Sequence, residues 1–282
     1  MHRFSQYLPI LSKIHYMFKN KKYQIKLSTL LIAISVWAST YSNLLASDLA
    51  KEQRMRDQVA DFVMDGDSVF LNTPTHEFLS IYMPTESALE KGTVIILHGR
   101  GFHPNWPQLI FPLRTGLTEH GWNTLSIQMP VLNNDASFYD YLAILPDSHP
   151  RINAAIQFIQ QKKPAKIILL AHSCGIYMGV DWLHKNPKTK VDAFIGIGMG
   201  PTDYGQPMLE PFPLQDIKIP VLDIHGANDY PAVLHNASRR WKNIQRAGNS
   251  KSQQQVVKGA DHYFNDRDAE LLNEIVSWLN TL

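Results

Sequence analysis

A serine in a short turn between two apolar stretches is the residue best placed to do chemistry in this 282-residue chain. Ser173 follows the apolar run 167–170 and precedes a helix-like stretch at 176–184. A sharp strand-to-helix turn exposes a serine hydroxyl above a sheet, where it can attack a substrate. Such a turn strains the backbone and needs small neighbours. Ala171 and Gly175 supply them, although glycine is more usual at the first position. The alternative is a polar turn after a buried strand.

Two residues later in the chain could activate this serine. A serine hydroxyl is a weak nucleophile at neutral pH and needs an adjacent base. His262 follows the last predicted strand and can accept the proton and return it to a leaving group. Asp229 follows the preceding strand and can fix the tautomer of the histidine. Capping of the helix that begins near Pro231 is the alternative role for Asp229, and Asp223, within the strand, is a rival acid.

Backbone amides near the serine could stabilise the negative charge of a tetrahedral intermediate, which needs two N–H donors. One is expected from Cys174, the residue after the serine. The other is expected from Arg100 or Gly101, which follow a predicted strand. Cys174 is the only cysteine, so the fold contains no internal disulfide. Its thiol is a rival nucleophile, but we favour the hydroxyl because Cys174 would occupy the first turn of the helix.

The segments around these residues alternate between strand and helix patterns. Continuous apolar runs such as 93–97 are typical of parallel strands buried on both faces. The alternation predicts an α/β fold with a mainly parallel central sheet and helices on both faces. Ligands of such sheets bind beyond the carboxyl ends of the strands, which is where the candidate residues lie. The predicted strands are 69–71, 77–84, 93–97, 122–128, 166–170, 191–197, 221–224 and 254–257, and the predicted helices are 107–120, 152–161, 177–184, 232–247 and 267–282.

Three stretches stand apart from this alternation, one before it and two that interrupt it. Residues 48–66 are polar and mixed, with room for one short helix. Residues 131–148 are rich in Tyr, Leu and Asn, and residues 201–218 are rich in Pro. We expect the last two to form loops over the carboxyl edge of the sheet.

The order Ser173, Asp229, His262 resembles that of the α/β-hydrolase superfamily over roughly residues 67–282. Residues 92–101, 112–114 and 121–130 (GTVIILHGRG, PLR and GWNTLSIQMP) are similar to a bacterial family of exported hydrolase-like proteins of unknown function. The residues and the resemblance imply hydrolysis of carboxylic esters or related acyl substrates through an acyl-enzyme on Ser173. A non-catalytic binding protein of the cell envelope on the same fold is the alternative.

Other polar and aromatic residues near the predicted sheet edge have competing interpretations. Four histidines, His98, His172, His225 and His262, could indicate zinc, but we expect packing histidines and neither a metal nor a cofactor. The Arg100 side chain could bind an anionic substrate group or lie in solvent. The stretch 138–141 (FYDY) could line an acyl pocket or pack on the core.

The N-terminus differs from the rest of the chain in charge. Residues 1–46 hold six of the 27 Lys and Arg residues and none of the 25 Asp and Glu residues. The remainder is therefore net acidic, and no nucleic-acid partner is expected. A basic stretch precedes the apolar run 30–38, and small residues follow, as in a secretory signal. Met17 is an alternative start.

This pattern predicts a cleaved export signal at 1–46, an extension at 47–66 and a hydrolase domain at 67–282. Cleavage could follow Ala38, Ser42 or Ala46. Export without disulfides suits a bacterial periplasm. The alternative is an uncleaved anchor in the inner membrane, because residues 27–47 are uncharged and about long enough to span a bilayer.

Overall fold

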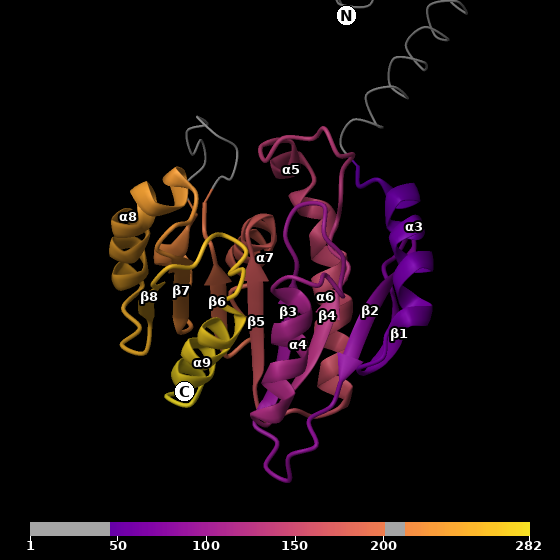
Figure 1. Ribbon diagram of the computed structural model, residues 1–282, viewed down its shortest axis with the longest axis horizontal. Coiled ribbons are helices and arrows are strands. Elements are labelled where there is room, and N and C mark those ends of the chain that lie inside the picture. The colour runs from indigo at the N-terminus through magenta and orange to yellow at the C-terminus, as the bar shows by residue number, and fades with distance from the viewer. Residues whose placement is uncertain (1–45, 201–211) are drawn as a thin grey trace, which may run out of the picture. The chain divides into compact units, whose positions relative to one another are not determined.

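Eight strands form one mainly parallel sheet in the computed structural model, which describes residues 46–200 and 212–282 (Figure 1). The strand order is β1-β2-β4-β3-β5-β6-β7-β8. The first two pairings of this order are antiparallel and all the others are parallel, so the predicted fold class is confirmed. The strands are β1 (Asp67–Asn72), β2 (Glu77–Met83), β3 (Gly92–Leu97), β4 (Trp122–Ile127), β5 (Ile167–His172), β6 (Ala193–Ile197), β7 (Val221–Gly226) and β8 (Gln253–Val257).

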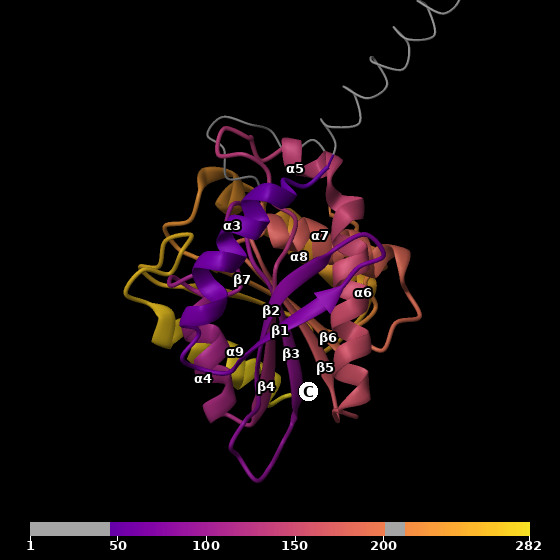
Figure 2. The same ribbon diagram turned by 90° about the vertical axis from the view of Figure 1, so that its right-hand side faces the viewer.

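Helices cover both faces of this sheet (Figure 2). Helices α4 and α9 pack on one face, and α6, α7 and α8 on the other. None of the helices in the described ranges is both long and apolar enough to cross a bilayer. The helices are α3 (Leu49–Val59), α4 (Ile110–Glu119), α5 (Asp140–Ala143), α6 (Leu145–Gln161), α7 (Cys174–Lys185), α8 (Pro231–Ala247) and α9 (Asp268–Leu279), with 3-10 turns η1 (Ala60–Phe62) and η2 (Leu214–Asp216).

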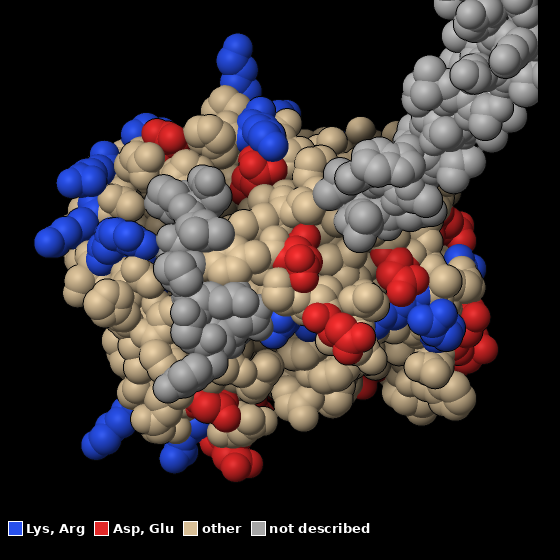
Figure 3. Space-filling model, turned by 90° about the horizontal axis from the view of Figure 1, so that it is seen from above, with Lys and Arg blue, Asp and Glu red and all other residues tan. Residues whose placement is uncertain are grey.

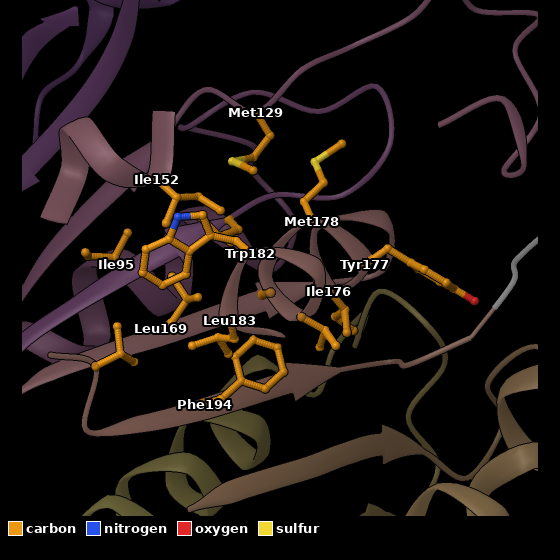
Figure 4. Packing of buried hydrophobic residues seen from close by; sticks show 14 of the residues in the cluster. Ile95, Met129, Ile152, Leu169, Ile176, Tyr177, Met178, Trp182, Leu183 and Phe194 are labelled. Carbon is orange, nitrogen blue, oxygen red and sulfur yellow. The ribbon is translucent and has the colours of Figure 1, made fainter. Parts of the chain in front are cut away.

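The apolar strands divide their side chains between two cores. In β5, Leu169 and Ala171 face the core beneath α6 and α7, whereas Ile168 and Leu170 face the core beneath α4 and α9. The alternation follows from the two-residue period of a strand. Figure 4 shows the first of these cores, where Trp182 of α7 packs above the sheet. Burying one such side chain stabilises the fold by roughly 1.5–3 kcal/mol.

The observed elements differ from the predicted ones mainly before the site helix. Residues 131–148 are not entirely a loop, because they contain α5 and the start of α6. Helix α6 begins at Leu145 and continues through Pro150. A proline this far inside a helix predicts a break, but burial of Ser148 and Arg151 holds the turn against the domain. Of the predicted Pro-rich loop 201–218, residues 201–211 lie outside the described part.

The predicted extension at 47–66 contains the expected short helix, α3, and contacts the domain through charged groups. The Asp48 side chain accepts a hydrogen bond from the Lys51 amide at 2.9 Å and so caps the helix. Glu52, in the first turn of α3, accepts two hydrogen bonds from Arg151 of α6, at 2.7 and 2.9 Å. Both side chains are buried. The compact unit accordingly runs from Ser47 to Leu282.

Replacing Glu52 should destabilise the protein strongly, because it leaves the Arg151 charge buried without its partner. We expect Glu52→Ala to lower the free energy of unfolding by about 3–5 kcal/mol, measured by urea denaturation. The matched control is Glu77→Ala, which breaks the exposed Arg56–Glu77 pair of 2.9 Å. That variant should lose about 0–1 kcal/mol. Equal losses of unfolding free energy in the two variants would show that the buried Glu52–Arg151 pair does not stabilise the contact of α3 with the domain.

Candidate active site

The backbone at Ser173 adopts the strained turn predicted from its small neighbours. Ser173 lies between β5 and α7 with φ 53° and ψ −122°. A positive φ in a residue other than glycine costs of order 1–3 kcal/mol and is held by surrounding structure. A Cβ at Gly175 would lie 2.6 Å from the carbonyl oxygen of His98 and 2.7 Å from that of Leu97. Only glycine therefore allows α7 to start this close to β3.

The other two predicted residues, Asp229 and His262, form a direct hydrogen bond. Asp229 follows β7 and His262 follows β8, and their Oδ1 and Nδ1 atoms are 2.7 Å apart. Both residues are buried. The same Oδ1 accepts the Tyr230 amide at 2.6 Å, which holds the carboxylate in place. The opposite ring nitrogen, Nε2 of His262, is buried without a hydrogen-bond partner in the described part of the chain.

Two consecutive residues at the end of β6 connect Ser173 with this pair. The Ser173 amide donates to the Ile197 carbonyl at 3.1 Å. The next residue, Gly198, has φ 69°, and a Cβ there would lie 2.8 Å from Cε1 of His262. It would also lie 3.3 Å from Oδ2 of Asp229. Sequence reasoning missed Gly198, although the alternating glycines 196, 198 and 200 after an apolar strand were a signal.

The predicted oxyanion-hole residues lie beside the serine. Cys174 starts α7, and its amide belongs to the electropositive end of that helix. On the other side, a Cβ at Gly99 would lie 3.2 Å from Cβ of Ser173, so the loop after β3 touches the turn. The Gly101 backbone lies near the Tyr141 hydroxyl, where it opposes the rise in the pKa of that group that burial causes. Arg100 and Gly101 are therefore both candidates for the second donor.

His98 and His172 are buried, and each tethers a loop of the site. Burial lowers the pKa of His98 to about 3. Its Nδ1 contacts the Gly99 carbonyl at 2.8 Å and its Nε2 accepts the Met129 amide at 2.9 Å. Burial, aided by His262, also lowers the pKa of His172 well below its ordinary value. The Nε2–H of His172 donates to the His262 carbonyl at 3.1 Å. Both rings are therefore neutral structural links.

Residues 46–200 and 212–282 contain no set of side chains that could bind zinc. No three His, Cys, Asp or Glu side chains converge there in a way that could hold a metal ion. Burial also lowers the pKa of His225.

The rival acid Asp223 has another partner. It lies inside β7 and pairs with Arg240 at 3.0 Å. Asp261, next to His262, accepts the Tyr263 amide at 2.9 Å. Of the two interpretations of the aromatic stretch, core packing fits Phe138 and Tyr141, which are buried in the core beneath α6 and α7.

The charges and hollows on the surface of the described residues add little information about the site. Seen from above the carboxyl edge, Lys and Arg side chains gather on the α8 side, and several Asp and Glu side chains lie nearer the middle of the face (Figure 3). The guanidinium of Arg100 donates to the Ala136 carbonyl at 3.2 Å. A hollow of about 590 Å³ lies between α6 and α7 near Lys185 and Asn186. It is at the far end of α7 from Ser173, so we do not assign it to the site.

The sheet order and the strand-end residues define a class of fold, the α/β hydrolases. The chain resembles a serine hydrolase homologue from Coxiella burnetii (18% identity, TM-score 0.56, covering 77% of this chain and 98% of that one). It resembles dienelactone hydrolase from Anabaena variabilis (18% identity, TM-score 0.59, covering 76% of this chain and 96% of that one). It also resembles Est1E from Butyrivibrio proteoclasticus (17% identity, TM-score 0.54, covering 74% of this chain and 95% of that one). At these identities the likeness shows the α/β-hydrolase fold and nothing finer.

The family within this class is shown by the sequence. Residues 46–147 and 142–281 match the model of the family "Protein of unknown function (DUF3530)". The protein belongs to this family. Comparison with curated proteins gives no match.

Two histidines with lowered pKa values, the buried His98 and the half-buried His103, should make stability fall as the pH drops. Burial lowers the pKa of His98 to about 3 and that of His103 to about 4, against about 6.5 in the unfolded chain. Between pH 7 and 5 the unfolded state therefore gains protons that the folded state does not. The free energy of unfolding should decline by up to about 1.4 kcal/mol per pH unit for each histidine.

Urea denaturation at pH 7, 6 and 5 measures this slope, because most carboxylates stay ionised in that range. His103→Gln should flatten the slope by the share of one histidine. A wild-type stability that is constant from pH 7 to 5 would refute neutral burial.

Proposed function

We propose that the protein is a serine hydrolase of carboxylic esters or related acyl substrates. The observation that carries the proposal is the 2.7 Å bond between Asp229 and His262, arranged around Gly198 beside the strained Ser173. A histidine oriented by a buried carboxylate is the arrangement that a serine needs for activation. The structural likeness to hydrolases supports the fold on which such a site is built.

In this mechanism Ser173 attacks the substrate carbonyl and His262 takes its proton. Asp229 keeps Nδ1–H of the ring bound, so Nε2 is the atom that accepts the proton. The amide of Cys174 and that of Arg100 or Gly101 stabilise the oxyanion. His262 then protonates the leaving group and activates water, which releases the acyl group from the serine.

The buried, unpaired Nε2 of His262 favours one other candidate, a binding protein on the same fold. Such a protein would hold an envelope ligand without turnover. We prefer the hydrolase because catalytic hydrogen bonds of free enzymes are often long and tighten only with substrate.

We further propose that the hydrolase acts in the bacterial periplasm, after export directed by residues 1–46. The basic and apolar composition of that segment supports this location. Retention of the segment as an inner-membrane anchor is the competing proposal.

A fluorophosphonate probe should label the purified protein on Ser173. We expect full loss of labelling in Ser173→Ala, detected by peptide mass spectrometry. Cys174→Ala is the matched control for the thiol and should retain the label, because it keeps the backbone amide. A folded wild-type protein that is not labelled would sink the hydrolase proposal and leave the binding protein.

Substitutions of the two buried aspartates, Asp229 and Asp223, should differ in their effect on ester hydrolysis. With a panel of acyl esters of increasing chain length, Asp229→Asn should lower kcat by about 10⁴, because it leaves the wrong histidine tautomer. Asp223→Asn should instead lower the melting temperature, since it weakens the Arg240 pair. Retained kcat in Asp229→Asn would refute its role as the orienting acid.

A further inference from the structure

The backbone nitrogen of Ser47 lies against a carboxylate. The Ser47 N–H donates to Oδ2 of Asp147, in the first turn of α6, at 3.0 Å. Within the described part of the chain, no cationic side chain forms an ion pair with Asp147. Ser47 is half-buried, the preceding Ala46 is exposed, and the compact unit begins at Ser47. The peptide bond between these two residues is therefore the boundary of the folded unit.

The side chain of Ser47 is also bound. Its hydroxyl accepts the Val131 amide at 2.9 Å and contacts the Val131 carbonyl at 3.1 Å. It donates to the Glu52 carboxylate, which is itself held by Arg151. The amide of Asp48 donates to the same Val131 carbonyl at 2.7 Å. Both the backbone nitrogen and the hydroxyl oxygen of Ser47 therefore form hydrogen bonds with the folded unit.

These bonds connect the start of the unit with the oxyanion side of the site. The residue after Val131, Leu132, donates its amide to the Tyr141 hydroxyl at 3.0 Å. The Gly101 backbone, in the loop that touches Ser173, lies near the same hydroxyl. Nζ of Lys51 donates to the Leu132 carbonyl at 2.8 Å, which adds a second tie. Ser47 is therefore linked through residues 131 and 132 to Tyr141, beside the loop after β3.

We propose that the chain is cut between Ala46 and Ser47, and that the new α-ammonium of Ser47 binds the Asp147 carboxylate. Water is the co-reactant: its oxygen goes to the Ala46 carbonyl carbon as the C–N bond breaks, and the freed Ser47 amine takes a proton. The enzyme required is a peptidase that accepts a small residue before the cut. Cleavage turns a neutral hydrogen bond into a charge-assisted one, which is roughly twice as strong.

This cut is one of three that the leader sequence allows. Cuts after Ala38 or Ser42 suit the leader too, but they leave extra residues before Ser47, so its nitrogen would stay a neutral amide. The charges nearby favour a cation at Ser47. Asp48 and Asp147 are acidic and Glu52 is already neutralised by Arg151, whereas Lys51 is engaged with Leu132 and Asn134.

The first test is the N-terminus of the protein recovered from a bacterium that exports the full chain. Edman sequencing and intact mass should give Ser47 as the first residue. Any other first residue, or an uncleaved chain, overturns the proposal.

The second test measures the pairing on the same exported protein. An amine-reactive acylating reagent at pH 7 modifies an unprotonated α-amine, and a neighbouring carboxylate favours the protonated form. Asp147→Asn should raise the labelling rate of Ser47 by about tenfold, equivalent to one pKa unit. Asp147→Glu keeps the charge and should stay near wild type, whereas a similar rise in this variant would show a perturbed fold and overturn the ion pair. Asp140→Asn, on α5, is the matched control and should leave the rate unchanged.

Equal labelling rates in wild type and Asp147→Asn would overturn the ion pair even if the cut is found. Neither readout uses hydrolysis of an ester. Failure of this proposal is therefore distinguishable from failure of the hydrolase assignment, on which only the link to the oxyanion loop depends.

Discussion

The left-handed backbone of Ser173 is the constraint on which the rest of the site depends. A serine in this conformation is stable only if its surroundings compensate for the strain. They do so through close backbone contacts. Gly175 admits the carbonyls of β3, and Gly99 brings the next loop against the Ser173 side chain. Ile197 accepts the Ser173 amide. Parallel strands make this possible, because their carboxyl ends meet along one edge.

A second feature is the buried polar framework under the loops. His98 links the loop after β3 to Met129, and Arg151 donates to the Gln128 carbonyl at 3.1 Å as well as to Glu52. Buried charges and amides of this kind are costly when any partner is missing. The framework therefore holds residues 128–132 in one arrangement, and with them the segment that contacts Gly101.

Elements with strong periodicity were predictable and those set by distant partners were not. The apolar run at β5 and the small residues around Ser173 predicted the elbow, since strand burial and backbone strain are local effects. The start of α6 was missed because local propensity opposes a helix through Pro150, and burial of Arg151 against Glu52, 99 residues earlier, reverses that preference. Gly198 was missed because its importance comes from His262, which only the fold brings close.

The sequence by itself determined the alternation of strands and helices, the strained serine and the order of Ser173, Asp229 and His262. These follow from side-chain periodicity, residue size and chain order. Only the tertiary structure decided which aspartate binds His262 and that Ser47 faces Asp147. Such choices depend on distances between residues far apart in the chain. A carboxylate orients a ring or pairs with an amine only within hydrogen-bond reach.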